Sequence, residues 1–412
     1  MSGEGESLNA SAARFGSDDN QLLVGGHTLG DLAARVGQTP FYAYDRRLIT
    51  QRVAELRDAI PASLHLHYAI KANPMPAVVQ LLSGLTDGLD VASAAEMQVA
   101  LDTGIAPELI SFAGPGKTDT ELAAAVAAGV IVNMESEGEM RRLAAIGDRQ
   151  GRRPVVSIRV NPAFELKTSG MKMGGGPKPF GVDEERVPRM LAELAALDLD
   201  FRGFHIFGGS QNLRVEAIVE SQRSTLELAT RLAAHSPVPM RWLNIGGGLG
   251  IPYFPGEKPL DLAPIADNLS DLCERAAREL PEATLVMELG RYLVAEAGIY
   301  VSEVVDRKES RGEVFLVTNG GLHHHLAASG NFGQVIRKNY PVCLGNRLVS
   351  PDTERVTVVG PLCTPLDILA DKVTLPRAES GDLVVIFQSG AYGYSASPHL
   401  FLSHPVPAQV LV

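Results

Sequence analysis

The chain has 412 residues, 45% of them hydrophobic and 21% charged, a composition typical of a globular protein with two domains or one large barrel. Its formal net charge of -11 argues against nucleic-acid binding, which requires a concentrated basic surface. Three widely spaced cysteines, Cys273, Cys343 and Cys363, predict neither a disulfide framework nor a paired-cysteine metal site, and they favour a reducing, cytoplasmic setting.

Two segments precede the first long run of alternating elements. Residues 1–20 are rich in Gly, Ser and Asp and lack the apolar core of a signal peptide, which predicts a disordered tail. Residues 21–40 contain a short β-like run, and we expect them to pack with a β domain formed by the C-terminal part of the chain. No apolar run in the sequence reaches the ~18 residues typical of a membrane span.

Residues 41–290 alternate short apolar runs with amphipathic helical patterns. The apolar runs predict eight strands: Leu66–Ile70, Leu89–Val91, Leu109–Phe112, Val130–Asn133, Val155–Val160, Gly203–Phe207, Trp242–Ile245 and Leu285–Glu288. Eight strands that alternate with helices over ~250 residues predict a parallel (β/α)8 barrel, an α/β fold. A doubly wound open sheet is the alternative, because the pattern alone does not fix the topology.

Residues 291–412 have a different sequence pattern, with turn residues rather than long helical patterns between the apolar runs. The predicted strands are Ala297–Arg307, Val314–Asn319, Arg355–Val359, Asp371–Thr374 and Leu383–Phe387. This pattern predicts a separate C-terminal β domain.

The sharpest motif is HYAIKAN at residues 67–73, in which Lys71 comes directly after a predicted strand. In barrel enzymes the C-terminal ends of the strands surround the active site. A lysine there can be desolvated and become a nucleophile toward an aldehyde. A lone lysine at a strand end is more often a solvent-exposed cap. The interpretation of Lys71 as a nucleophile therefore depends on other motifs in the sequence.

Two further motifs follow predicted strands. NIGGGLG at residues 244–250 has consecutive glycines, whose backbone N–H groups can converge on a phosphate. It is not a dinucleotide fingerprint, because Ile251 occupies the position of the last required glycine. ELGRY at residues 288–292 places Glu288 where a carboxylate can pair with a protonated pyridine nitrogen. Each motif taken alone also fits a structural glycine turn or an ion pair at the barrel end.

Together these motifs make the chain similar to the fold-type III pyridoxal-phosphate decarboxylases, the family of the diaminopimelate and ornithine decarboxylases. Further motifs in the family's order are DVASAAE (90–96), FHIFGGSQ (204–211), GPLCTPLD (360–367) and GAYG (390–393). The resemblance implies a barrel followed by a β domain, pyridoxal 5'-phosphate as cofactor, and a homodimer with shared active sites. Amino-acid racemases of the same fold are a rival, but they typically carry an arginine where this chain has Glu288.

The resemblance also implies roles for individual residues. Lys71 would bind the cofactor as a Schiff base, and Glu288 would pair with its ring nitrogen. Cys363 of the partner subunit resembles the thiol that protonates the substrate carbon after CO2 leaves, a task suited to a group that exchanges protons near neutral pH. The other implied cofactor contacts are Asp90, His205, Phe207, Ser210, Gly247, Gly248, Arg291 and Tyr392; the implied substrate contacts are Arg291, Thr364, His324 and Tyr392; and Asp90 and Glu96 would orient the lysine.

Two positions depart from the family's pattern. Most members have a histidine that stacks on the pyridine ring where this chain has Phe207. A phenyl ring can also stack, and we expect His205, on the same strand face, to lie one layer deeper as part of the core. Thr364 replaces the acid that binds the distal charge of a diamino acid. Because a threonine cannot pair with an ammonium, we expect free diamino acids to be poor substrates, with diaminopimelate as the alternative.

Residues 319–342 (NGGLHHHLAASGNFGQVIRKNYPV) resemble the biosynthetic branch of the family, which includes the glutamyl-carrier-protein decarboxylase of butirosin assembly and exosortase-associated decarboxylases. This resemblance suggests a substrate tethered through a side-chain acyl group to a carrier protein. His323–His325 predict no metal site, because no Cys or carboxylate follows at ligand spacing; we expect them to line the substrate entrance or to serve structure. Candidates for contact with an acidic carrier are Lys167, Lys172, Lys178, Arg337 and Lys338.

Overall fold

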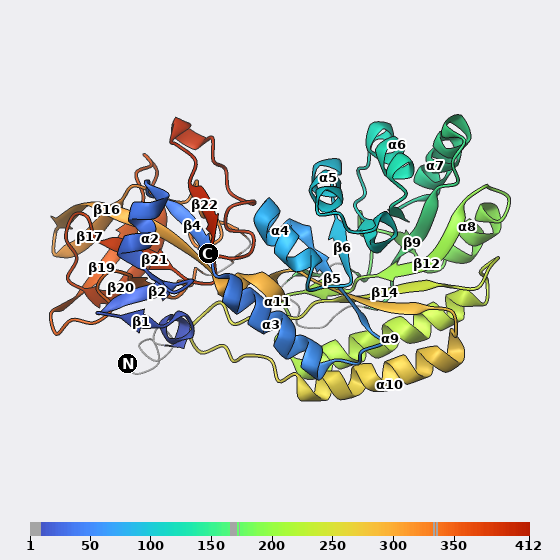
Figure 1. The fold of residues 1–412 in the computed structure, drawn as a ribbon, viewed down its shortest axis with the longest axis horizontal. Coiled ribbons are helices and arrows are strands. Elements are labelled where there is room, and N and C mark those ends of the chain that lie inside the picture. The colour runs from blue at the N-terminus through green and yellow to red at the C-terminus, as the bar shows by residue number, and fades with distance from the viewer. Residues whose placement is uncertain (1–9, 165–170, 173, 333, 335–336) are drawn as a thin grey trace. The chain divides into compact units, whose positions relative to one another are not determined.

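The computed structural model describes residues 10–164, 171–172, 174–332, 334 and 337–412 (Figure 1). The chain forms two compact units. The barrel unit comprises Val53–Ile251 and Pro259–Tyr292, and the β unit comprises Met1–Arg52, Pro252–Lys258 and Leu293–Val412.

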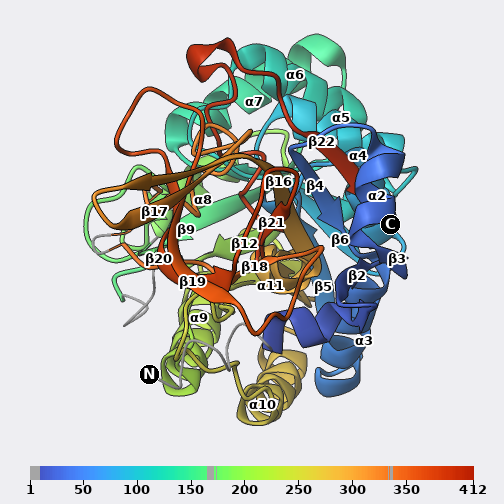
Figure 2. The same cartoon turned by 90° about the vertical axis from the view of Figure 1, so that its left-hand side faces the viewer.

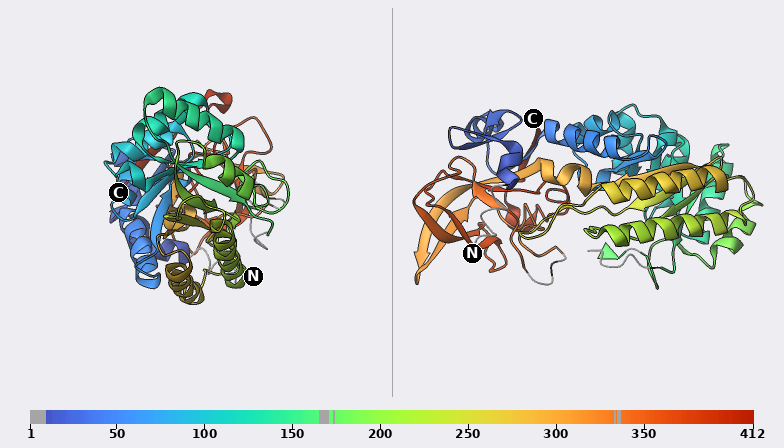
Figure 3. Two further views of the ribbon diagram at one scale, coloured as in Figure 1. Left: turned by 90° about the vertical axis from the view of Figure 1, so that its right-hand side faces the viewer. Right: turned by 90° about the horizontal axis from the view of Figure 1, so that it is seen from below.

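Eight parallel strands of the barrel unit close on themselves (Figure 3, left). In order around the barrel they are β5 (His65–Ala69), β6 (Gly88–Val91), β7 (Ile110–Phe112), β8 (Ile131–Met134), β9 (Val155–Asn161), β12 (Asp200–Ile206), β14 (Trp242–Gly247) and β15 (Thr284–Leu289). Pairing of β15 with β5 completes the ring. Each strand overlaps its predicted range, so the barrel is confirmed and the open-sheet alternative is wrong.

Helices follow the strands and surround the barrel (Figure 3, left). Ser93, Thr118 and Ser136 begin three of them, and each side-chain oxygen accepts a hydrogen bond from the backbone N–H three residues on. Because each cap comes soon after a strand end, it fixes where the chain turns back along the outside of the barrel. The helices are α3 (Arg46–Ala59), α4 (Pro76–Ser83), α5 (Ala94–Asp102), α6 (Asp119–Ala128), α7 (Glu137–Gln150), α8 (Val187–Leu194), α9 (Val215–Ala233) and α10 (Ala263–Glu279).

Short elements complete the C-terminal ends of the barrel strands. They are the 3-10 turns η1 (Ile70–Ala72) and η2 (Pro107–Leu109), the strands β10 (Met171–Lys172), β11 (Val182–Asp183) and β13 (Gly209–Ser210), and the one-turn helix α11 (Arg291–Val294). β11 pairs in parallel with the end of β9, and β10 pairs antiparallel with β13.

The β unit is built on a sheet with the strand order β18-β21-β16-β17-β19-β20, and β4 pairs with both β16 and β22 (Figure 2). Its elements are β1 (Ser17–Asp18), β2 (Gln21–Val24), β3 (His27–Thr28), α2 (Leu29–Val36), β4 (Phe41–Tyr44), η3 (Ala295–Ala297), β16 (Gly298–Ser310), β17 (Glu313–Thr318), β18 (Val342–Leu344), β19 (Thr353–Val359), β20 (Ile368–Pro376), β21 (Leu383–Ile386), η4 (Phe401–Ser403) and β22 (Ala408–Leu411). The predicted C-terminal β domain is confirmed.

The N-terminal part differs from the prediction in two ways. Residues 10–15 are helical and β1 follows, so residues 10–20 are not a disordered tail. Phe15 is buried against Phe387, with ring centroids 5.8 Å apart, and the Arg14 guanidinium pairs with Glu296. The barrel unit begins at Val53 rather than at residue 41, because β4 hydrogen-bonds to the sheet of the β unit.

Within the described ranges, no helix is long and apolar enough to cross a membrane.

Candidate active site

Lys71 lies at the C-terminal end of β5, in the turn η1. Its neighbours Ile70 and Ala72 are buried and hold the turn in place, whereas the Lys71 side chain is exposed. Its Nζ lies 5.6 Å from the centroid of the Phe207 ring, within cation–π range. The amine is therefore accessible beside an aromatic face, as the covalent attachment of a flat cofactor requires.

Two acidic residues follow on the neighbouring β6 and α5. Oδ1 of Asp90 lies 3.2 Å from Nδ1 of His67 and accepts a hydrogen bond from the Ser111 hydroxyl. Its other oxygen is buried and has no hydrogen-bond partner within the described ranges. Glu96 accepts a hydrogen bond from a backbone N–H; burial raises the pKa of its carboxyl, and the charge of Lys71 acts in the opposite direction. The predicted role of Glu96 in orienting Lys71 stays a prediction.

Glu288 lies at the end of β15 and is buried. Nδ2 of Asn244 donates a hydrogen bond to its Oε2 at 3.0 Å, and Nε2 of His205 lies 3.1 Å from the same oxygen. Burial alone would raise the pKa of Glu288, but the charge of His205 and its contact, followed by the charges of Lys71 and Arg159, hold that pKa well below its usual range. An ionised carboxylate in this position can keep a pyridine nitrogen protonated.

His205 lies in β12, and Phe207 is the first residue after that strand. Their ring centroids are 6.5 Å apart. Phe207 faces Lys71, and His205 is buried deeper, as we expected from the strand alternation. Nε2 of His205 lies 3.1 Å from the Glu288 carboxylate, and its predicted contact with the cofactor stays a prediction.

The glycine segment after β14 has a backbone suited to binding an anion. Gly246 and Gly248 have positive φ angles of 70° and 80°, which favour glycine. A Cβ on Gly247 would lie only 2.0 Å from the carbonyl oxygen of Glu288, so a side chain does not fit there. The N–H of Asn212 donates to the carbonyl of Gly248 at 3.0 Å and ties the glycine segment to the loop that contains Ser210. Backbone N–H groups in such a turn, with a nearby hydroxyl, can bind a phosphate.

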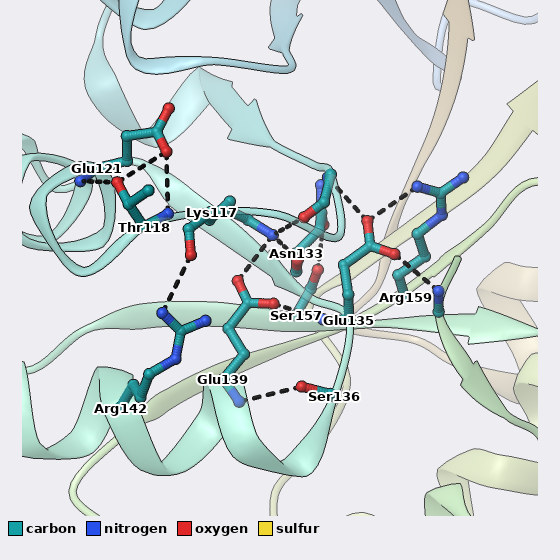
Figure 4. Close-up of polar contacts among 12 residues, drawn as sticks. Lys117, Thr118, Glu121, Asn133, Glu135, Ser136, Glu139, Arg142, Ser157 and Arg159 are labelled. Atoms are coloured by element: carbon teal, nitrogen blue, oxygen red, sulfur yellow. Dashed lines mark hydrogen bonds and ion pairs between the residues drawn. The ribbon is translucent and has the colours of Figure 1, made fainter. Parts of the chain in front are cut away.

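A buried network of charged side chains, which the sequence analysis missed, lies at the ends of β8 and β9 (Figure 4). Arg159 donates to Glu135 at 2.9 Å, and Lys117 pairs with Glu139 at 2.7 Å. The Arg159 guanidinium also lies over the Phe180 ring, 5.1 Å from its centroid. The signal in the sequence was the arginine within the mostly apolar predicted strand Val155–Val160, since a buried cation needs a partner.

Glu135 is the centre of this network. Besides Arg159, it accepts hydrogen bonds from the backbone N–H groups of Gly114, at 2.8 Å, and Gly181, at 2.7 Å. It therefore joins three loops at the C-terminal ends of the strands, and it holds the cation whose charge lowers the pKa of Glu288.

Glu135→Ala should lower the free energy of unfolding by about 3–5 kcal/mol, because it leaves the Arg159 guanidinium buried without its partner. Denaturant titration of the purified protein measures this change. Arg141→Ala, which breaks an exposed ion pair with Glu193, is the matched control and should change stability little. Equal losses in the two variants would contradict the structural importance of the buried pair.

The predicted thiol lies in the β unit, in the loop between β19 and β20. Of the three cysteines, only Cys363 is exposed; Cys273 is half-buried and Cys343 is buried, and burial raises the pKa of both of these thiols. The Asp367 carboxylate holds the loop, because it accepts hydrogen bonds from the N–H of Leu362 at 2.8 Å and of Leu322 at 2.6 Å. The loop is anchored while its thiol remains open to solvent.

Other predicted substrate residues have less favourable surroundings. His324 is buried, its Nε2 lies 2.8 Å from the carbonyl oxygen of Pro405, and its Nδ1 lies 3.2 Å from the Tyr300 hydroxyl. These contacts favour a structural role over the predicted contact with substrate. Thr364, Tyr392 and Arg291 are half-buried, Tyr392 with a positive φ of 58°, and their predicted roles stay predictions.

The candidates for contact with a carrier protein are mostly not supported. The Arg337 guanidinium donates to the carbonyl oxygens of Ser329, at 3.0 Å, and Ile368, at 2.9 Å, so it is engaged within the β unit. Nζ of Lys338 lies 5.3 Å from the centroid of the Phe254 ring. Lys178 is half-buried, and Lys167 and the side chain of Lys172 lie outside the described residues.

The residues of the barrel unit fit a phosphorylated pyridine aldehyde. Lys71 offers an amine for the aldehyde, and Glu288 an ionised carboxylate for the ring nitrogen. The turn around Gly247, where a side chain would collide with β15, offers N–H groups for the phosphate. The buried, unpartnered Oδ2 of Asp90 further indicates that this end of the barrel is built to receive a hydrogen-bond donor.

Comparison with known proteins agrees with this chemistry. Residues 46–295 match the pyridoxal binding domain of the pyridoxal-dependent decarboxylases. The chain is 38% identical to the L-glutamyl-[BtrI acyl-carrier protein] decarboxylase of Niallia circulans over 91% of its own length and 89% of that protein. It is 32% identical to the 2-[(L-alanin-3-ylcarbamoyl)methyl]-2-hydroxybutanedioate decarboxylase of Staphylococcus aureus, over 89% of its own length and 92% of that protein.

A solved structure shares the fold over nearly the whole chain. Diaminopimelate decarboxylase from Helicobacter pylori, in complex with L-lysine, superposes with a TM-score of 0.82 at 28% identity, over 93% of this chain and 94% of that one. The chain therefore belongs to the pyridoxal-dependent decarboxylases, with pyridoxal phosphate as its cofactor.

Proposed function

We propose that this enzyme decarboxylates an α-amino acid whose side-chain acyl group is linked to a carrier protein. The observation that carries the proposal is Thr364, a neutral, half-buried residue next to the exposed thiol of Cys363. An acid in this position would favour a distal ammonium through a charge-assisted hydrogen bond worth about 1.5–3 kcal/mol. Threonine lacks that attraction and suits an amide, ester or thioester.

The names of two relatives support a neutral distal linkage. The Niallia circulans enzyme acts on a glutamyl group of an acyl-carrier protein. The Staphylococcus aureus enzyme acts on a compound in which an alanine side chain carries a carbamoyl group. Neither name describes a free diamino acid.

In this proposal the barrel residues prepare the substrate for loss of CO2. Pyridoxal phosphate, when bound, supplies an electron sink for the electron pair that remains after CO2 departs. The Lys71 amine would hold the cofactor through its aldehyde. Glu288 keeps the proton on the ring nitrogen, and the N–H groups around Gly247, with the Ser210 hydroxyl, bind the phosphate. Arg291, at the start of α11, is the proposed contact for a phosphate or carboxylate.

Cys363 is the proposed proton donor to the carbon that loses CO2. We propose that it acts in the active site of a second copy of the chain, in a homodimer. The exposed thiol supports this, as do the exposed apolar side chains of Leu366 and Phe332 in the same unit, 58% and 45% accessible, which a second copy can cover. The proposed location is the cytoplasm, where an exposed thiol stays reduced.

Free diaminopimelate is the second candidate substrate. The similarity to the Helicobacter pylori diaminopimelate decarboxylase, which extends over nearly the whole chain, favours it. The two candidates differ in the charge of the distal group, so they can be separated by one substitution.

Thr364→Glu should raise activity on diaminopimelate and lower activity on an acyl-linked amino acid, because the new carboxylate attracts an ammonium and repels a carbonyl oxygen. A change of about 10-fold in the ratio of kcat/KM values corresponds to 1.4 kcal/mol. Thr364→Gln, similar in size and neutral, is the matched control and should leave the ratio nearly unchanged. An unmodified enzyme that already decarboxylates free diaminopimelate efficiently would contradict the carrier-linked proposal.

Intact-mass analysis tests the proposal directly. The enzyme is incubated in parallel with glutamyl- and other aminoacyl-carrier proteins and with the free amino acids, and each sample is examined for loss of CO2. We expect the loss only on a carrier-linked substrate. Loss of CO2 from free amino acids alone would overturn the proposal.

A further inference from the structure

We infer that His205 is a positioning residue that holds the Glu288 carboxylate in place for the ring nitrogen of the cofactor. The inference deepens the proposed function and rests on it, because it concerns the cofactor end of the same site. It assigns a task to an imidazole that is almost fully buried.

The Glu288 carboxylate is contacted on one of its two oxygens. Both side chains are buried, with His205 3% and Glu288 7% accessible. Nε2 of His205 lies 3.1 Å from Oε2 of Glu288, and Nδ2 of Asn244 donates to the same oxygen at 3.0 Å. Within the described ranges, both polar contacts of this carboxylate fall on Oε2. Oε2 is therefore anchored from β12 and β14, which leaves Oε1 to accept a hydrogen bond from a ligand.

The Glu288 carboxylate is buried, and burial of a charged group costs free energy. Removal from water disfavours the ionised form unless donors compensate for it. Asn244 supplies one neutral donor, and it is also engaged with the backbone, since its Oδ1 accepts from the N–H of Gly246 at 2.8 Å. The His205 imidazole is the second polar group at this carboxylate, with Nε2 3.1 Å from Oε2; burial raises the pKa of Glu288, and the charge of His205 opposes that rise. The charges of Lys71 and Arg159 also lower the pKa of this carboxyl.

The His205 imidazole lies near aromatic side chains. Its ring lies 6.5 Å from the rings of both Phe207 and Trp242, measured between centroids. Both of its nitrogens are buried, and within the described ranges neither of them makes a hydrogen bond of regular geometry. A polar ring placed among aromatic groups is unfavourable unless a charged or polar group compensates for it, and the Glu288 carboxylate, 3.1 Å from Nε2, is that group.

The test compares two forms of the cofactor. The full-length enzyme is stripped of cofactor and reconstituted either with pyridoxal phosphate or with its carbocyclic analogue, in which C–H replaces the ring nitrogen. Dissociation constants are measured by absorbance. The wild type should bind pyridoxal phosphate at least about 10-fold more tightly, the size expected for one charge-assisted hydrogen bond. His205→Leu should bring this ratio close to one, while His205→Gln, which keeps an N–H donor, should restore part of it.

Trp242→Phe is the matched control, because it changes another neighbour of the imidazole without touching the carboxylate. It should keep the wild-type ratio. A His205→Leu enzyme that keeps the full preference would overturn the inference, and a general packing defect would weaken both cofactors equally and so also leave the ratio unchanged. Equal binding of the two cofactors by the wild type would overturn the roles of both Glu288 and His205. Failure of the wild type to bind either cofactor would overturn the proposed function together with the inference.

Discussion

Lys71→Ala should lower the rate of decarboxylation by several orders of magnitude, the largest effect that we expect from a single substitution. The reason is that the variant loses the amine that binds the cofactor covalently and takes part in every exchange with the substrate. The rate of CO2 release under single-turnover conditions measures the loss. The fold should be unaffected, because the Lys71 side chain is exposed and its neighbours Ile70 and Ala72 carry the packing of the turn.

Lys71→Arg separates covalent chemistry from charge. It keeps a cation near the Phe207 ring but removes the primary amine, so it should be nearly as inactive as the alanine variant. Lys308→Ala, at an exposed position on β16, is the control for the loss of a lysine and should keep the wild-type rate. An arginine variant with substantial activity would show that the lysine acts only through its charge.

Cys363→Ala should change the product as well as the rate. Without the thiol, we expect protonation at the cofactor's carbon instead of the substrate's carbon, which gives an aldehyde and pyridoxamine phosphate in place of part of the amine. General acid catalysis typically contributes about 10²–10⁴-fold, so the rate should fall within that range. Chromatography of the products and the absorbance of the cofactor measure the partition. Cys273→Ser, at a half-buried position on α10, should leave the product ratio unchanged.

Mixed dimers test whether Cys363 serves the other subunit. Neither Lys71→Ala nor Cys363→Ala should be active alone at the wild-type rate. When the two are unfolded and refolded together, a shared site would pair an intact Lys71 with an intact Cys363 and restore up to about a quarter of the wild-type activity, because half of the dimers are mixed and each has one complete site. No recovery beyond the sum of the parents would contradict the shared site.

The fold could be predicted because its signal is local. Each barrel strand is a short apolar run followed by turn residues and a helical pattern, and β5, β9 and β15 lie within about two residues of their expected ranges. The pairing of β4 with β16 and β22 could not be predicted in this way, because it joins strands that are hundreds of residues apart in the chain. The regular structure of residues 10–20 likewise depends on distant residues, because Phe15 packs against Phe387 and Arg14 pairs with Glu296.

The site was predictable where a motif carries the chemistry in its residue types, as Lys71 and the glycines around Gly247 do. It was not predictable where the function of a side chain depends on a contact across strands. For His205 the sequence predicted a deeper position and a cofactor contact, but not Glu288, whose carboxylate lies 3.1 Å from its Nε2 in the folded barrel. Arg159 gave only the weak signal of a cation inside an apolar strand, and its partner Glu135 comes from the preceding strand–helix loop.

Reduction with borohydride followed by peptide mass analysis tests the central claim most directly, because it asks which residue holds the cofactor. The purified enzyme, loaded with pyridoxal phosphate, is reduced, digested and sequenced by mass spectrometry. We expect the reduced cofactor on the peptide that contains Lys71 and none on Lys117, which is buried in an ion pair with Glu139. A reduced adduct on any other lysine, or none at all, would contradict the assignment of this enzyme's active site.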